Sequence, residues 1–153
     1  MTQPILLSLV YLFAVTATLH AQAPKVSVLI DLDPNSTAQT VIIESIAADQ
    51  EGRLYVCDRV TGNVLRIDPK NPKPLVVGRV EAREIEGKKV RADSSGIVFN
   101  QAGDLYITSG AFREILRIKK ADLNPNKPGI AETFATGTEG ANGIAFDKQG
   151  DLY

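Results

Sequence analysis

The chain is poor in the residue types that most often act as catalytic bases or as soft metal ligands. Its 153 residues include one histidine, His20, one cysteine, Cys57, and no tryptophan. A Ser-His-Asp triad, a Cys-His pair and a histidine-ligated zinc site all require an imidazole. One cysteine cannot close an intramolecular disulfide, and Cys57 lies in an apolar run typical of a buried strand. Any catalysis is therefore expected to rest on carboxylates, amides, hydroxyls and a hard metal ion.

The chain also lacks an excess of charge of either sign. Seventeen Lys and Arg residues face 18 Asp and Glu residues, which gives a formal net charge of −1. The two kinds are mixed along the sequence and form no basic stripe. Nucleic acid is therefore not an expected partner.

Residues 1–23 differ in composition from everything that follows. An uncharged apolar run at 5–19 precedes the sequence His-Ala-Gln-Ala at 20–23, the small-x-small pattern of a signal-peptidase site. We interpret this segment as a secretory signal peptide, although it has no Lys or Arg and Pro24 would follow the cut. The alternative is an uncleaved N-terminal anchor, for which the run is short. The mature protein is expected to be secreted or periplasmic, free of the membrane and without His20.

A nine-residue phrase occurs three times and is the main indication of the fold. The copies start at Glu44, Ser95 and Asn142, roughly 50 residues apart, and each ends in glycine followed by a polar-Leu-Tyr run. We expect an inner strand in each copy, closed by a tight turn where Gly52 or Gly103 supplies a positive φ. A period of this size built from short strands predicts an all-β protein, a β-propeller with one blade per repeat.

Apolar runs between the copies predict the other strands of each blade. Second strands are expected at 54–57 and 105–108, third strands at 64–67 and 115–118, and outer strands at 74–77 and 131–135. The alternation at 25–31 also predicts a strand. For the charged stretch at 80–91, a solvated edge strand and loop is favoured over a short helix, because Gly87 interrupts the stretch. Nearly continuous apolar runs in the second and third strands indicate sheets covered on both faces.

The chain ends at Tyr153, inside an expected strand of the third repeat. Two complete blades and part of a third cannot close a propeller of four to eight blades. We therefore expect residues 24–153 to be a partial propeller, a fragment of a protein about twice as long or more. Such a fragment is expected to have unpaired strand edges and to be catalytically inactive alone.

The first position of the repeat is the best candidate for function. The inner strands of a propeller line its central channel, so Glu44, Ser95 and Asn142 are expected to converge on the channel mouth. Carboxylate, hydroxyl and amide oxygens suit a hard divalent cation such as Ca²⁺ or Mg²⁺, which can polarise a carbonyl or activate water. In the simpler alternative, Ser95-Gly96 and Asn142-Gly143 are ordinary turn pairs and Glu44 is a solvated charge.

Three phrases resemble the senescence marker protein/gluconolactonase-like family. They are Asn-Gly-Ile-Ala-Phe-Asp at 142–147, Gly-Asp-Leu-Tyr-Ile-Thr at 103–108 and Leu-Arg-Ile-Asp at 65–68. Members of this family are six-bladed propellers, and the characterised enzymes are metal-dependent lactonases. The wider set of propellers with NHL-type repeats uses similar phrases.

The resemblance implies roles for the residues at the first repeat position. It implies Glu44 and Asn142 as ligands of a divalent cation, with a third ligand, an Asp, on a later blade beyond Tyr153. It also implies that Ser95 contacts the substrate, although the lactonases usually carry Asn there. Ser45-Ile46 likewise stand where Gly-Pro usually follows the first ligand.

Three functions remain open for the whole protein. The first is a secreted, metal-dependent, lactonase-like hydrolase that acts on a small lactone or ester at the channel mouth. The second is a non-catalytic NHL-like propeller that binds a protein or a glycan. The third is a propeller lyase, which usually needs a histidine base.

Overall fold

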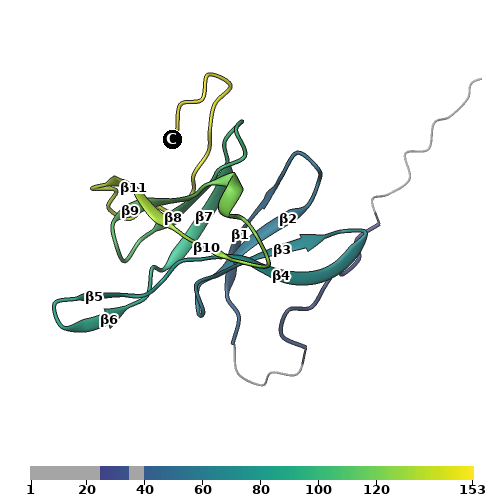
Figure 1. The fold of residues 1–153 in the computed structure, drawn as a ribbon, viewed down its shortest axis with the longest axis horizontal. Helices are drawn as coiled ribbons and strands as arrows, with labels where there is room; N and C mark the ends of the chain where they lie inside the picture. The colour runs from purple at the N-terminus through teal and green to yellow at the C-terminus, as the bar shows by residue number, and fades with distance from the viewer. Residues whose placement is uncertain (1–24, 35–39) are drawn as a thin grey trace, which may run out of the picture.

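The computed structural model describes residues 25–34 and 40–153, which form eleven strands and one short 3-10 helix. The predicted signal peptide at 1–23 lies outside the described residues. Among the residues described, no helix is long and apolar enough to cross a lipid bilayer. The strands belong to two large sheets and one small hairpin (Figure 1). The all-β prediction is therefore confirmed.

The first sheet is the blade of the first repeat and is called blade 1. It contains four antiparallel strands in chain order and a short fifth strand, β10, which runs parallel to the outer strand β4. The bounds are β1 (Ile43–Ala48), β2 (Leu54–Asp58), β3 (Asn63–Asp68), β4 (Asn71–Arg79) and β10 (Gly129–Ile130). Because β10 lies in the segment that connects the third and fourth strands of the second sheet, it ties that sheet to the outer strand of blade 1.

The second sheet is the blade of the second repeat and is called blade 2. Its bounds are β7 (Ser94–Phe99), β8 (Leu105–Ser109), β9 (Glu114–Ile118) and β11 (Glu132–Thr136), with the 3-10 helix η1 (Lys120–Asp122) after β9. The strands are antiparallel neighbours in chain order. All six strands predicted for the two blades beyond the repeats are thus confirmed, within a few residues at their ends.

Two other predictions need correction. Residues 25–31 form no strand, and Val26 and Val28 are exposed because no described strand pairs with this segment. The stretch 80–91 contains a hairpin rather than one edge strand, made of β5 (Arg83–Ile85) and β6 (Lys88–Val90). Its turn residues Glu86 and Gly87 both have positive φ, 50° and 72°, as tight hairpin turns require. Gly87 therefore makes the hairpin turn.

The three repeats close in the same turn, held by the side chain at the sixth repeat position. In each copy the Oδ1 atom of that residue accepts a hydrogen bond of 2.9 Å from the backbone N–H four residues later: Asp49 from Arg53, Asn100 from Asp104 and Asp147 from Asp151. The turn glycines Gly52, Gly103 and Gly150 have φ of 77°, 88° and 91°. The predicted role of glycine in these turns is confirmed.

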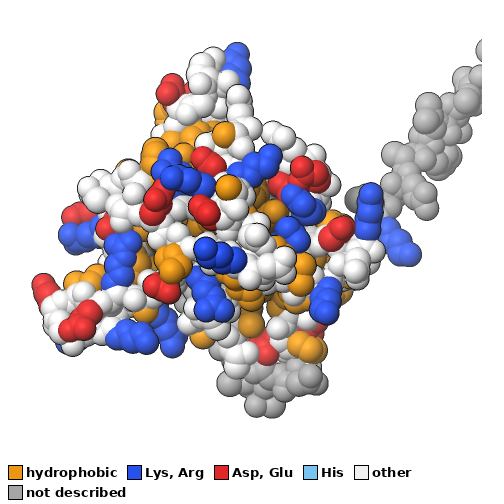
Figure 2. All heavy atoms as spheres, in the orientation of Figure 1, with side chains coloured by type: hydrophobic (Ala, Val, Ile, Leu, Met, Phe, Trp, Pro, Cys, Tyr) orange, Lys and Arg blue, Asp and Glu red, His pale blue; other side chains and the backbone are white. Residues whose placement is uncertain are grey.

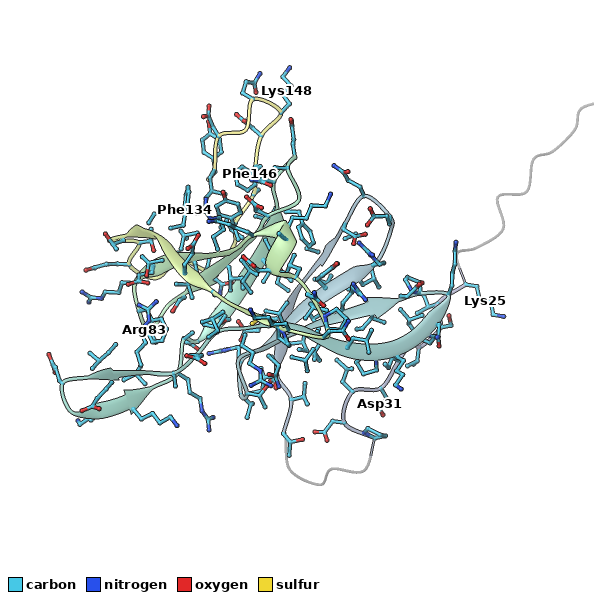
Figure 3. All side chains as sticks on the ribbon, viewed as in Figure 1. Lys25, Asp31, Arg83, Phe134, Phe146 and Lys148 are labelled. Atoms are coloured by element: carbon cyan, nitrogen blue, oxygen red, sulfur yellow. The ribbon has the colours of Figure 1, made fainter. Side chains whose placement is uncertain are left out.

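An aromatic contact repeats between successive copies. The ring of Tyr55 meets Phe99 of the next repeat edge-to-face at 4.8 Å, and Tyr106 meets Phe146 of the third repeat at 5.0 Å. Tyr106 also contacts Phe134 of β11, so Phe134 and Phe146 of the third repeat both pack on the ring of Tyr106 (Figure 3). The third repeat therefore packs on blade 2 as blade 2 packs on blade 1, which is the packing of a β-propeller.

The core lies within and between the two blades. It includes Val64 and Val77 of blade 1 and Leu105, Ile107 and Leu116 of blade 2, all fully buried. Cys57 is also buried and forms no disulfide, as predicted. Burial raises the pKa of its thiol to about 11, so this sulfur behaves as a small apolar group.

Candidate functional site

The first repeat position lies at the beginning of the inner strands. Glu44 is the second residue of β1, Ser95 is the second residue of β7, and Asn142 begins the corresponding segment of the third repeat. β1 and β7 are neighbours in the fold (Figure 1), and the backbone N–H of Ile97 donates to Ser45 Oγ at 3.3 Å. The inner strands of the two blades are therefore in contact at the level of the predicted site.

Thr108 holds the third repeat against blade 2. Its Oγ1 atom donates to the backbone oxygen of Asn142 at 3.0 Å and accepts the N–H of Gly96 at 2.7 Å. A Cβ on Gly96 would collide with the same oxygen of Asn142. Glycine at position 96 and a buried hydroxyl at position 108 therefore set the backbone position of Asn142, while its side chain is exposed.

Glu44 takes part in an ion-pair cluster that the sequence did not indicate. The guanidinium of Arg59, which follows β2, contacts the carboxylate of Glu44 through Nη1 and that of Asp93 through Nη2. Asp93 directly precedes β7 and has a positive φ of 54°. The Arg59 cluster, defined as Arg59, Glu44 and Asp93, thus joins the inner ends of the two blades with one cation between two carboxylates.

The three predicted site residues differ in their surroundings. Glu44 belongs to the Arg59 cluster, and Ser95 lies beside it because its Oγ atom donates to the backbone oxygen of Asp93 at 3.4 Å. Asn142 is tied to Ser95's strand through Thr108. Within residues 25–34 and 40–153, no hydrogen bond joins the side chains of Glu44, Ser95 and Asn142 to one another.

The donor types suit a hard cation, but the described ligand set is short. Glu44 and Asn142 offer carboxylate and amide oxygens, which are ligands that Ca²⁺ accepts. The described part of the chain holds no group of three His, Cys, Asp or Glu residues arranged to bind a metal. In addition, Arg59 already neutralises Glu44. A divalent ion at this position would therefore have to replace Arg59 at Glu44 and gain ligands from elsewhere.

Arg59, Asp93 and Thr108 were missed by the sequence analysis. A signal existed for Arg59, because the residue that follows the second strand is Arg59 in blade 1 and Gly110 in blade 2. An arginine at a turn position where the other blade has glycine indicates that its side chain makes an interaction specific to blade 1. No comparable signal marked Asp93, which lies 34 residues from its partner Arg59.

A cavity of about 380 Å³ adjoins the Arg59 cluster. Its walls come from the turn after β2, the end of β4, and the chain from β6 to the start of β7. Arg59 and Asp93 form one side, and Arg79, Lys89 and Arg91 are among the other lining residues. The cavity therefore opens on the end of the blades where the predicted site lies.

A larger cavity, of about 450 Å³, lies at the opposite end of the blades. It is lined by the repeat turns of both blades, including Asp49, Tyr55 and Phe99. Partial burial opposes ionisation of Asp49, but hydrogen bonds from the side chain and backbone of Arg53 and from Tyr55 hold its pKa below the ordinary value. This acid therefore stays charged as part of the turn, and nothing sets it up as a proton donor near neutral pH.

Solved structures similar to this chain are propeller proteins of several functions. One is a catalytically inactive histidine-to-alanine variant of virginiamycin B lyase from Staphylococcus aureus with quinupristin (TM-score 0.53, 20% identity, 77% of this chain and 36% of that one). Another is the PQQ-bound aldose sugar dehydrogenase of Streptomyces coelicolor (TM-score 0.53, 19% identity, 72% of this chain and 36% of that one). A third is the extracellular domain of a putative one-component system from B. thetaiotaomicron (TM-score 0.52, 20% identity, 72% of this chain and 15% of that one).

These similarities establish the β-propeller fold alone. Neither a protein-family model nor a curated protein matches the chain. The chain spans about a third of the length of the lyase and the dehydrogenase. The similar proteins include a lyase, a dehydrogenase and the extracellular domain of a putative one-component system, so the fold does not select one activity.

Proposed function

We propose that this chain contributes the first blades of a six-bladed, gluconolactonase-like propeller that is secreted or periplasmic. The protein would hydrolyse a small lactone or ester at the channel mouth, with a divalent cation held there. The observation that carries the proposal is the Arg59 cluster, where carboxylates of two adjacent blades meet a single cation at the start of the inner strands. A site that gathers carboxylates around a cation is suited to a divalent ion that takes its place.

Each residue near the mouth has a proposed task. Glu44 and Asn142 would hold the ion, which when bound would polarise the carbonyl of the substrate and lower the pKa of a water. Ser95 would donate to an oxygen of the substrate. Thr108 keeps the backbone of Asn142 in register with β7 through its hydrogen bonds. Arg59 would hold the Glu44 carboxylate in place before the ion arrives.

The test is a calorimetric titration of the full-length protein with Ca²⁺. We expect binding by the wild type, loss of at least tenfold in affinity for Glu44→Gln, and a gain for Arg59→Gln, which removes the competing cation. Glu84→Gln on the β5–β6 hairpin is the matched control, because it makes the same change on an exposed residue away from the mouth. Binding that Glu44→Gln leaves unchanged would rule out this site.

A second candidate is the non-catalytic propeller, in which the Arg59 cluster has a structural role. Arg59 already satisfies Glu44 and Asp93, so the cluster can serve as a structural link between blades with no ion. This alternative predicts that Arg59→Gln destabilises the protein and creates no affinity for Ca²⁺. It also predicts that neither Glu44→Gln nor Ser95→Ala alters binding of a protein or glycan partner. The two candidates therefore differ in one titration of Arg59→Gln.

A further inference from the structure

The cavity of about 380 Å³ beside the Arg59 cluster is lined by more basic than acidic residues. Four basic residues line it, Arg59, Arg79, Lys89 and Arg91, against the two acids Glu81 and Asp93. Arg59 is paired with Asp93 and with Glu44. Arg79, Lys89 and Arg91 form no salt bridge with any residue in the described part of the chain.

The floor of this cavity is fixed. Val80, Ala92 and Ser94 are buried there, and the N–H of Val80 donates to the backbone oxygen of Gly62 at 2.7 Å. Gly62 packs so closely that a Cβ would collide with the backbone oxygen of Val80. The buried hydroxyl of Ser109 donates to the backbone oxygen of Ala92. Exposed basic side chains therefore stand around a rigid floor.

The β5–β6 hairpin that carries Lys89 is anchored on blade 2 by Arg83. The Nη1 atom of Arg83 lies 3.0 and 2.9 Å from the two carboxylate oxygens of Glu114, and Nη2 donates to Thr133 Oγ1 at 3.2 Å. Its guanidinium also lies 4.4 Å from the ring centroid of Phe112. Figure 3 shows Arg83 near the point where the hairpin leaves the sheets, and Figure 2 shows that the hairpin carries both basic and acidic side chains. The hairpin is thereby held as one wall of the cavity.

We propose that this cavity binds a phosphate or sulfate group of a small molecule. Its volume lies within the range of small-ligand sites. Several unpaired basic side chains around one hollow create a positive potential that a compact dianion relieves best, through charge-assisted hydrogen bonds from guanidinium and ammonium groups. A phosphate or sulfate group has more acceptor oxygens than a carboxylate, so it can accept hydrogen bonds from several of these side chains at once. The proposal is independent of the ion and of the hydrolysis proposed at Glu44.

The test is a calorimetric titration of the full-length protein with inorganic phosphate, in buffer of low ionic strength. We expect saturable binding that weakens as salt is added, and a loss of about tenfold in affinity for Lys89→Gln and for Arg91→Gln. Lys88→Gln is the matched control, because it removes the same charge from the same strand but does not line the cavity. It is expected to change the affinity less than twofold.

Competition by glucose 6-phosphate and glucose 6-sulfate identifies the source of the group. Displacement of inorganic phosphate by either ester supports the proposal, and the stronger competitor shows whether the cavity serves phosphorylated or sulfated molecules. The proposal is overturned if inorganic phosphate does not bind, if neither ester displaces it, or if Lys88→Gln weakens binding as much as Lys89→Gln. Circular dichroism of each variant shows whether it is folded, and the Ca²⁺ titration of Glu44→Gln tests the proposed function separately.

Discussion

Ile46 and Ile97 occupy the same position of the repeat, in β1 and β7, but Ile46 is 60% exposed and Ile97 is 5% exposed. Within its own sheet each strand pairs with one antiparallel second strand, β1 with β2 and β7 with β8. The difference comes from the adjacent repeats, because β7 lies between β1 and the third repeat, whereas β1 contacts β7 on one side only among the described residues. In a propeller, burial of an inner strand therefore depends on its neighbouring blades more than on its own sequence.

The largest expected difference between the blades concerns these two isoleucines. Ile97→Ala is expected to lower the free energy of unfolding by about 2–4 kcal/mol, because it opens a cavity between packed strands. Measured in the 153-residue chain, Ile46→Ala removes the same atoms from an exposed side chain and is expected to cost under about 1 kcal/mol. Urea unfolding followed by circular dichroism measures both. Equal losses would show that adjacent repeats do not determine burial.

The second repeat position gives a matched pair of glycines. Gly96→Ala is expected to cost about 1–3 kcal/mol, because the new Cβ meets the backbone oxygen of Asn142. In the 153-residue chain, Gly143→Ala adds the same methyl group where no atom lies within 4 Å, so we expect a change within about 0.5 kcal/mol. Thermal unfolding compares the two. A larger loss of stability for Gly143→Ala than for Gly96→Ala would contradict the described packing of the third repeat on β7.

The two blades also differ in how their stability should depend on pH. Blade 1 has Asp49 and Asp58 where blade 2 has Asn100 and Ser109. Burial opposes ionisation of Asp58, but hydrogen bonds from the Thr61 side chain and from backbone N–H groups lower its pKa, as those from Arg53 and Tyr55 do for Asp49. Because both pKa values are lowered on folding, their stabilising effect is present above the unfolded value, about pH 4, and is lost on further acidification.

Hydrogen exchange between pH 5 and pH 3 tests this difference. We expect the amides of β1 and β2 to lose protection before those of β7 and β8, and Asp49→Asn to reduce that loss. Asp147→Asn makes the same chemical change in the third turn, where Asp151 replaces the arginine, and is the control. Simultaneous loss of protection in both blades would contradict the assignment of acid sensitivity to blade 1.

The smallest expected effect concerns a glutamine contact between successive turns. Gln50 Nε2 donates to the backbone oxygen of Gln101 at 3.2 Å, and Gln101 Nε2 donates to that of Lys148 at 3.5 Å. Both are exposed, so Gln50→Ala and Gln101→Ala should each cost under about 0.5 kcal/mol. A double-mutant comparison of unfolding midpoints measures them. A cost above about 1 kcal/mol would mean that these turns carry more of the contact between blades than the aromatic pairs.

The sequence was sufficient for features that repeat or that depend on near neighbours. The turn at Asp49 recurs at Asn100 and Asp147 because a short side chain reaches the backbone four residues away. The strand predicted at 25–31 was wrong because alternation alone does not supply a partner strand.

The candidate site was harder to predict than the strands. The Arg59 cluster escaped prediction because it joins residues that only the packing of the blades brings together. Thr108 looked like any strand residue, although its hydroxyl fixes Asn142. The first repeat position was found because it starts each copy, but its chemistry depends on neighbours that differ from blade to blade.

A crystal structure of the full-length protein grown with Ca²⁺ tests the central claim most directly. The account predicts an ion with a carboxylate oxygen of Glu44 and the side-chain oxygen of Asn142 at about 2.4 Å, and Arg59 released from Glu44. If Arg59 still bridges Glu44 and Asp93 with no ion beside them, the channel mouth is not a divalent-cation site and the proposed hydrolase is contradicted.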